Sequence, residues 1–270
     1  IVPIPQAPIL TITRPVDPTP FELGIRFMTE IAVVTGASGG IGRVLARQLT
    51  AQGCRVAAVG RDAERLAGVE AAVRIAADTT TPEGAASALV ACQEALGAAP
   101  TLLAHCVGST LIAALHRTRA EAYREVMRVN LDSAVFMLQA WIGALQGGSG
   151  AAVFVSSVVA RMGVANHEAI AAAKGGVEAL VRSAAATYAA QGVRVNAVAP
   201  GMTETPMTAG MLKVPAMREG AGRQYPLGGV QTAEQVADVM AWLLGDGAAR
   251  LTGQVIAVDG GFTTVRPLVR

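Results

Sequence analysis

The segment Thr35-Gly36-Ala37-Ser38-Gly39-Gly40-Ile41-Gly42 lies between a short apolar run, Ile31–Thr35, and a stretch with helical periodicity, Ile41–Ala51. Glycines in a strand-to-helix turn let the backbone approach a pyrophosphate closely, and the amino end of the helix offers unpaired amide donors. A glycine-rich turn that merely packs tightly is the alternative, but the position between strand and helix favours binding. The predicted dinucleotide site consists of Thr35, Gly36, Ser38, Gly39, Gly40, Ile41 and Gly42.

From this turn onward, short apolar runs alternate with longer helical stretches, which is typical of a parallel sheet covered on both faces. The predicted strands are Ile31–Thr35, Arg55–Val59, Val73–Ala76, Leu102–Cys106, Ala151–Ser156, Arg194–Ala199 and Gln254–Val258. The predicted helices are Ile41–Ala51, Ala63–Val69, Glu83–Leu96, Ala120–Leu145, His167–Ala190 and Ala233–Leu244. Such strands are joined by right-handed crossovers. We therefore predict an α/β protein with a single-domain Rossmann fold, a doubly wound seven-stranded parallel sheet with helices on both faces.

The composition limits the partners that can be expected. The chain has 270 residues, a formal net charge of +2 and three cysteines. No run of about 18 apolar residues occurs, so we expect no membrane span. The scattered basic residues disfavour nucleic acid and anionic membranes as partners. Because the cysteines lack metal-ligand spacing, we expect no metal site, and buried thiols in a cytoplasmic protein.

Residues 1–27 differ from the rest because they are rich in proline, which removes amide donors and fixes φ. They lack the basic start and apolar core of a secretory signal. We predict a flexible extension before a single domain over 28–270. A structural arm that packs on a neighbouring subunit is the alternative.

The end of the second predicted strand bears on the choice of cofactor. An acidic side chain there would bind the ribose diol of NAD and repel a 2′-phosphate. Gly60 stands at that place and Arg61 follows it, with a guanidinium suited to bidentate phosphate contact. These residues favour NADP(H), the alternative being that Arg61 is a solvated loop residue.

Several motifs together resemble the short-chain dehydrogenase/reductase family over Glu30 to about Phe262. The glycine spacing matches the family's TGxxxGxG form, and the segments Asn196–Thr205 and Leu251–Gly261 match its later motifs. The usual Asn-Asn-Ala-Gly is replaced by His105-Cys106-Val107-Gly108, so the polar bracing of that loop must differ. The resemblance implies that further cofactor contacts come from Asp78, Gly108, Asn130, Lys174, Pro200, Gly201, Thr203 and Thr205.

The resemblance also implies catalytic roles for three residues. Asn130 would position water, Ser157 would hydrogen-bond a substrate oxygen, and Lys174 would hold the nicotinamide ribose. The family's tyrosine, four positions before the lysine, is replaced by Ile170, which has no exchangeable proton and cannot act as general acid or base.

His167 is the candidate that could replace the tyrosine as proton donor. It lies one helical turn before Ile170, and an imidazole exchanges protons at neutral pH. The alternatives are a histidine that flanks the start of the helix, Glu168 as an acid, Tyr225 from the lid, and protonation from water.

We thus expect an NADP(H)-dependent oxidoreductase that reduces a carbonyl or an activated double bond of a small-molecule substrate. The alternative is a weak or inactive relative that binds NADP(H) as a sensor or partner subunit. Residues 203–228 are expected to form the substrate lid, with its apolar mobile part over Met207–Tyr225. The resemblance implies a homotetramer or homodimer built on the two long helices.

Overall fold

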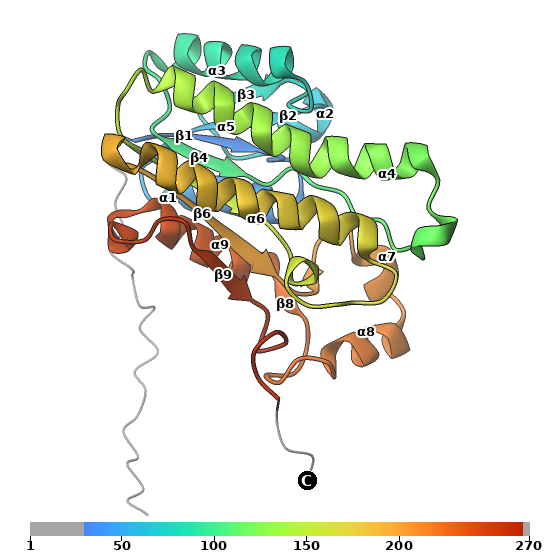
Figure 1. Ribbon diagram of the computed structural model, residues 1–270. Helices are drawn as coiled ribbons and strands as arrows, with labels where there is room; N and C mark the ends of the chain where they lie inside the picture. Colours follow the sequence, from blue (N-terminus) through green and yellow to red (C-terminus); the bar gives the residue numbers. More distant parts are fainter. Residues whose placement is uncertain (1–29, 267–270) are drawn as a thin grey trace, which may run out of the picture.

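The computed structural model describes residues 30–266, so the extension predicted for residues 1–27 lies outside the described part. At its centre is a seven-stranded parallel sheet of order β3-β2-β1-β4-β5-β6-β9 (Figure 1). The chain builds the sheet outward from β1 in one direction and then, from β4, in the other. The predicted doubly wound sheet is confirmed, and the carboxyl ends of β1 and β4 flank the point where ligands bind in such folds.

The elements have the following bounds. The strands of the main sheet are β1 (Ile31–Thr35), β2 (Arg55–Gly60), β3 (Val73–Ala76), β4 (Leu102–His105), β5 (Gly150–Val155), β6 (Val193–Pro200) and β9 (Val255–Val258). A parallel pair, β7 (Thr203–Glu204) and β8 (Gln231–Thr232), stands apart. The α-helices are α1 (Gly40–Ala51), α2 (Ala63–Ala67), α3 (Pro82–Leu96), α4 (Ala120–Met127), α5 (Ser133–Ala144), α6 (Glu168–Tyr188), α7 (Ala209–Leu212), α8 (Pro215–Gly222) and α9 (Ala233–Leu244). Short helical turns are η1 (Leu115–Arg117), η2 (Arg128–Asp132), η3 (Val158–Ala160), η4 (Ala189–Gln191) and η5 (Asp246–Ala248).

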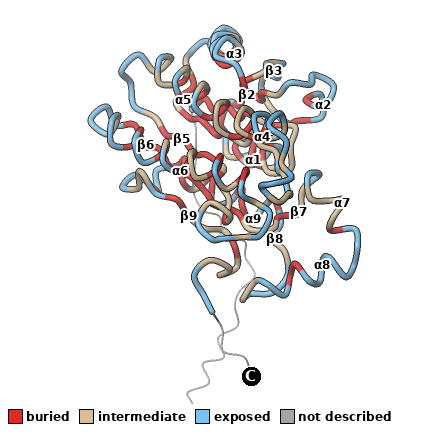
Figure 2. The backbone as a smooth tube through the Cα atoms, turned by 45° about the vertical axis from the view of Figure 1, so that its right-hand side comes forward, coloured by how far each residue is buried: buried red, intermediate tan, exposed pale blue. Residues whose placement is uncertain are grey.

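Two apolar cores cover the two faces of the sheet. Helices α3, α5 and α6 bury side chains such as Trp141 and Val181 against one face. Helices α1 and α9 bury Leu45 and Met240 against the other face. Buried segments are concentrated in the sheet and the helix faces that cover it, whereas α8 is largely exposed and α7 is mostly half-buried (Figure 2). The sheet therefore fixes the positions of the strand ends, and helices α7 and α8 lie beside them (Figure 1).

The structure corrects the single helix predicted over Ala120–Leu145. The π-helical turn η2 separates α4 from α5. The Asn130 side chain donates to the Val126 carbonyl, which an unbroken α-helix would give to the Asn130 amide, and Ser133 Oγ donates to the Val129 carbonyl at 2.6 Å. Because these side chains take carbonyls of the helical ladder, one extra residue is accommodated. The inserted turn carries Asn130 to the edge of the predicted site.

The predicted lid segment, 203–228, contains more regular structure than its sequence indicates. Strand β7, helices α7 and α8 and the approach to β8 follow one another there. Pro215 begins α8 at a position where proline's missing amide costs nothing. None of the helices among residues 30–266 combines the length and apolar character needed to cross a membrane.

Candidate active site

The glycine turn after β1 is packed so tightly that side chains are excluded. Gly36 has a φ of +65°, and a Cβ on it would lie 2.7 Å from the backbone of Cys106. A Cβ on Gly42 would collide with the carbonyl oxygen of Gly36. A Cβ on Gly40 would lie 2.6 Å from Thr205 Cγ2, so the turn also touches the start of the lid segment. The turn therefore presents bare backbone, as a pyrophosphate cradle requires.

The amino end of α1 opens onto this turn without a side-chain cap. By contrast, Asp62, Thr81 and Thr232 cap α2, α3 and α9 with side-chain oxygens. Amides in the first turn of a helix have no partner within the helix, and the helix dipole favours an anion beside them. The uncapped end of a twelve-residue helix beside a glycine cradle fits a dinucleotide's pyrophosphate.

A charged cluster lies at the ends of β2 and β3, where an adenosine is expected. Asp78 accepts hydrogen bonds from the amide and hydroxyl of Thr80, and its carboxylate is 3.6 Å from Arg128. Partial burial opposes ionisation, but the Thr80 hydrogen bonds and the charges of Arg128 and Arg61 outweigh it and lower the pKa of Asp78. Within residues 30–266, the Arg61 side chain forms no hydrogen bond or ion pair, which leaves its guanidinium open to a phosphate.

The Arg43 guanidinium, unlike that of Arg61, forms hydrogen bonds with the protein itself. Its guanidinium donates to the carbonyls of Gly68 and Arg65 at 3.1 and 3.0 Å, where it satisfies the carboxyl end of α2. The Arg43 guanidinium, although it follows the glycine turn closely in the chain, is therefore engaged away from it.

His105 braces the loop after β4 where the family resemblance places an asparagine. Ser133 Oγ donates its one proton to the Val129 carbonyl, so in its contact with His105 Nε2, at 3.0 Å, it must be the acceptor. His105 Nδ1 therefore carries no proton and accepts from Thr35 Oγ1 at 2.8 Å. Burial lowers the pKa of His105 to about 3, and the charge of Lys174 acts in the same direction. A neutral imidazole thus ties the end of β1 to the first turn of α5.

Asn130 is fully buried and has all its donors engaged. Its Nδ2 donates to Ser109 Oγ and to the Val126 carbonyl, both at 3.0 Å, and its Oδ1 accepts from the Ser109 amide at 3.2 Å. Sequence reasoning missed Ser109, although its position directly after Gly108 was a signal. Ser109 and Asn130 together hold the loop after β4 against η2.

Lys174 lies beside Asn130 across a glycine. A Cβ on Gly108 would be 3.1 Å from Asn130 Oδ1 and 3.4 Å from Lys174 Nζ, so the structure brings these three predicted residues together. Lys174 Nζ donates to the Val155 carbonyl at 2.8 Å. Burial lowers the pKa of the ammonium to about 8, against the smaller opposing effect of Cys106. This lysine can therefore bind an anionic or hydroxyl group and can also exchange a proton near neutral pH.

Ser157 follows β5 and caps η3, where its Oγ accepts from the Val159 amide at 3.4 Å. The hydroxyl proton remains free to be donated to a ligand. Ile170 is only 4% exposed and packs with Val126, Ala169 and Ala173. The apolar cluster around Ile170 also includes Leu111 and Val159.

His167 lies at the amino end of α6, just before its first residue. Its Nδ1 donates to the Ala165 carbonyl at 2.8 Å, which leaves Nε2 to carry or accept a further proton. No hydrogen bond among the described residues joins it to Asn130, Ser157 or Lys174. The Tyr225 hydroxyl accepts from the Met202 amide at 2.6 Å and its ring packs against Gly201 and Phe262, so this side chain is held just after the end of β6.

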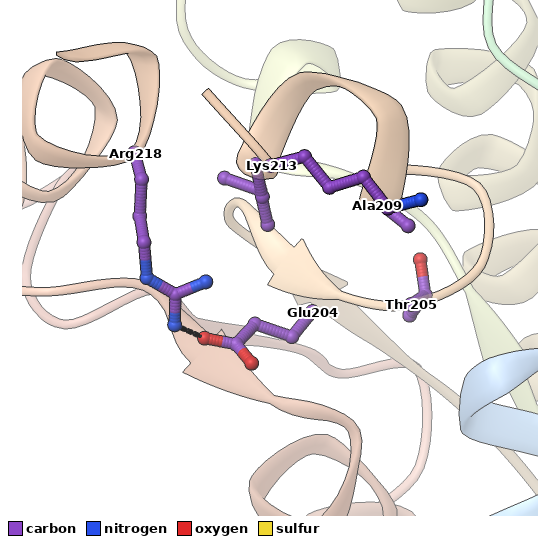
Figure 3. Close-up of a pocket in the computed structure, with 6 residues that line it drawn as sticks. Glu204, Thr205, Ala209, Lys213 and Arg218 are labelled. Carbon is purple, nitrogen blue, oxygen red and sulfur yellow. Dashed lines mark hydrogen bonds and ion pairs between the residues drawn. The ribbon is translucent and has the colours of Figure 1, made fainter. Parts of the chain in front are cut away.

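The segment from Pro200 to Thr205 leads from β6 into the lid. Thr203 Oγ1 donates to the Gly201 carbonyl, and Thr208 Oγ1 lies within hydrogen-bond reach of both Thr203 and Thr205. A cavity of about 190 Å³ follows, lined by Glu204, Thr205, Ala209, Leu212, Lys213 and Arg218 (Figure 3). Arg218 is paired with Glu204, while the Lys213 side chain extends along the cavity toward Thr205. Thr205 thus forms part of both the cavity wall and the contact with the glycine turn.

Charged residues that sequence reasoning left out support this site from outside. Arg128 pairs with Glu125 at 2.7 Å and also reaches Thr80, so it links η2 to the loop after β3. Glu178 accepts from Ser156 Oγ and Arg161 on the turn that carries Ser157. The contacts of Arg128 with Thr80 and of Glu178 with Ser156 join segments far apart in the chain. A glutamate between apolar residues of a predicted helix was the only signal for them in the sequence.

The family described as enoyl-(acyl carrier protein) reductase matches residues 36–263 of this chain. Cis-4-hydroxycyclohexanecarboxylate dehydrogenase of Sinomonas cyclohexanicum is 37% identical over 253 residues, which cover 90% of this chain and 100% of that protein. Inactive 2-(S)-hydroxypropyl-CoM dehydrogenase 2 of Xanthobacter autotrophicus is 36% identical over 231 residues, which cover 82% of this chain and 100% of that protein.

Solved structures agree with these relatives. A short-chain type dehydrogenase/reductase from Mycobacterium ulcerans superimposes with a TM-score of 0.85 at 30% identity, covering 90% of this chain and 92% of that one. A structure from Agrobacterium tumefaciens with bound NADP superimposes with a TM-score of 0.80 at 29% identity, covering 88% and 97% of the two chains. The fold and the glycine turn, together with these relatives, define an oxidoreductase of the Rossmann type. The chain belongs to the short-chain dehydrogenase/reductase family.

Proposed function

We propose that this protein is an NADP(H)-dependent oxidoreductase that reduces a carbonyl or an activated double bond of a small molecule. The observation that carries the proposal is the convergence of Asn130, Lys174 and Gly108 on one point beside the glycine turn. A protein that only folded in this way would have no need for a buried ammonium with a lowered pKa at that point. The relative from Sinomonas cyclohexanicum, named as a dehydrogenase of a hydroxycyclohexane carboxylate, supports chemistry at a C–OH or C=O carbon.

The residues at the carboxyl ends of the strands fit the parts of a nicotinamide dinucleotide. The glycine turn and the uncapped end of α1 would hold the pyrophosphate, and Asp78 would lie near the adenine. Lys174 would hold the nicotinamide ribose, Asn130 would fix the loop beside it through Ser109, and Thr205 would face the carboxamide end. When bound, the dinucleotide supplies hydride transfer, and the protein's part is to orient the acceptor and exclude water.

The proton must come from a group other than a tyrosine. Ser157 can donate a hydrogen bond to the acceptor's oxygen, which polarises it without supplying a net proton. Two proton carriers lie on or beside α6: Lys174, whose pKa is lowered to about 8, and His167 with its free Nε2. We propose His167 as the donor and Lys174 as the cation that stabilises negative charge at the acceptor. An acceptor protonated by water needs neither.

The preference for NADP(H) rests on Arg61. Its guanidinium stands at the end of β2 without a protein partner among residues 30–266, close enough to Asp78 to lower the pKa of that carboxyl. A 2′-phosphate would neutralise this cation, whereas a plain ribose diol would leave it unpaired. The structural relative with bound NADP is consistent with this assignment.

The test is a screen of ketones, aldehydes and enones with NADPH consumption as the readout, together with fluorescence titration of NADPH. Tight binding of NADPH with turnover of at least one acceptor supports the proposal. Absence of NADPH binding would refute it.

A non-catalytic role as a binding protein is the second candidate. Ile170 is buried in an apolar cluster, so the missing phenol leaves no polar gap for a replacement to fill. The relative from Xanthobacter autotrophicus is named as inactive. NADPH binding without turnover across the screen, and without gain of turnover in an Ile170→Tyr variant, would favour this candidate.

A further inference from the structure

The carboxylate of Glu178 forms hydrogen bonds with both ends of the Ser156–Arg161 turn, which carries Ser157. Glu178 Oε1 accepts from Ser156 Oγ at 2.9 Å, at the start of the turn. Both carboxylate oxygens accept from Arg161 Nε, at 3.2 and 3.1 Å, at the end of the turn. Ser157 and the short helix η3 lie between these two anchors. One side chain therefore spans the whole turn.

The same carboxylate belongs to the helix that carries Lys174. Glu178 lies one helical turn after Lys174 on α6, and both side chains are buried. Lys174 Nζ donates to the Val155 carbonyl, directly before Ser156. Ser156 Oγ also lies 3.5 Å from the Lys174 carbonyl, a longer hydrogen bond than the one to Glu178. The turn is thus attached to α6 through Val155, Ser156 and Arg161, and Glu178 accepts the hydrogen bond from Arg161 and the shorter of the two from Ser156.

The burial of Glu178 makes its carboxylate depend on the hydrogen-bond donors of the turn. Its side chain is 7% exposed, whereas those of Arg161 and Arg182 are 38% and 57% exposed. A buried carboxylate is stable only when hydrogen-bond donors and cations satisfy it. Apart from Arg182, which is 3.8 Å away, the donors that satisfy Glu178 come from the turn. Displacing the turn would strip the carboxylate of its partners, so the two move as one unit.

We infer that Glu178 is a positioning residue that sets the place of Ser157 relative to Lys174. The carboxylate acts by holding the Ser156–Arg161 turn against α6 through its hydrogen bonds with Ser156 and Arg161. We call the hydrogen bonds of Glu178 with Ser156 and Arg161 the clamp, and the clamp itself is a property of the fold. Only its effect on turnover rests on the proposed function.

Amide hydrogen exchange tests the clamp without any activity. The amides of Ala160, Arg161 and Met162 donate to carbonyls within the turn and report its opening. In Glu178→Gln we expect their exchange to accelerate about tenfold or more, because a hydrogen bond to a charged group is lost. Glu234→Gln is the matched control, since it removes an exposed pair with Arg47 far from the turn. Unchanged exchange in Glu178→Gln would overturn the clamp.

Turnover tests whether the clamp acts through Ser157. In Glu178→Gln we expect kcat to fall about tenfold to a hundredfold, because small misplacements of a reacting group are costly. The KM for NADPH should stay within about twofold, since no cofactor contact is removed. In a Ser157→Ala background, Glu178→Gln should cost nothing further. An additive loss would assign Glu178 a merely structural role and overturn the inference. If no substrate is reduced at all, the proposed function fails while the exchange result still decides the clamp.

Discussion

The neutral, buried His105 should make the stability of this protein fall steeply in mild acid. Burial lowers the pKa of His105 from the ordinary 6.5 to about 3. The unfolded chain therefore binds a proton between these values that the folded chain refuses, so stability rises with pH across this window. The contribution is fully present above about pH 6.5 and is lost progressively as the pH falls toward 3.

The magnitude follows from the width of the window. Each pH unit inside it costs about 1.4 kcal/mol, so the free energy of unfolding should drop by about 2 kcal/mol between pH 7 and pH 5 from this side chain alone. Lys174 does not interfere, because its pKa of about 8 keeps it cationic in the folded state across this range.

Urea unfolding followed by tryptophan fluorescence at pH 7 and pH 5 measures this drop, at one protein concentration. His105→Asn and His105→Gln remove the titrating ring and keep a polar side chain. Both variants should lose about 2 kcal/mol less between the two pH values than the wild type does. Because the comparison is made within each protein, a lower absolute stability of a variant leaves it intact. An equal pH dependence in all three proteins would refute the assignment of a neutral, buried imidazole.

Four further predictions concern binding and turnover. Arg61→Asp should weaken the binding of NADPH about tenfold to a hundredfold and leave NADH as the better ligand, since a charge-assisted phosphate contact is lost. Equal affinities of the wild type for both cofactors would contradict this. His167→Ala should lower kcat about a hundredfold with NADPH affinity within about twofold, and unchanged turnover would eliminate the histidine as donor. Ile170→Tyr should raise ketone reduction by about a hundredfold or more; a screen without any gain would show that the pocket geometry has also changed. The reduction rate should fall as the pH rises through about 8, where Lys174 loses its charge, and a flat profile from pH 7 to 9 would exclude a required ammonium.

The strands and the doubly wound class of the sheet could be predicted from the sequence, because local signals determine each strand. Each strand is an apolar run bounded by turn residues, and a parallel sheet buried on both faces requires that pattern. The break at Arg128–Asp132 could not be predicted in this way. The apolar periodicity continues through it, and the break arises from side-chain hydrogen bonds that Asn130 and Ser133 make with carbonyls one turn away.

Only those residues of the candidate site that belong to motifs with a known spacing could be predicted from the sequence. Asn130, Lys174 and Gly108 were placed by motif, and the structure brings them into contact. The partners that fix them were not visible, because Ser109 meets Asn130 across 21 positions and Ser156 meets Glu178 across 22. The sequence showed that an asparagine was replaced at His105. It did not show that Thr35 and Ser133 would satisfy both ring nitrogens, since that depends on the strand register.

The contact between Gly40 and Thr205 limits how this chain can diverge. A methyl group at position 40 would overlap the branched carbon of a residue 165 positions away, and that carbon is not the free end of a flexible side chain. Substitutions at the two positions are therefore not independent: Thr205 Cβ itself would lie 2.7 Å from the added carbon, so alanine at 40 becomes tolerable only after 205 has become glycine. Among descendants of this sequence, these two sites should change together, in a fixed order, or not at all.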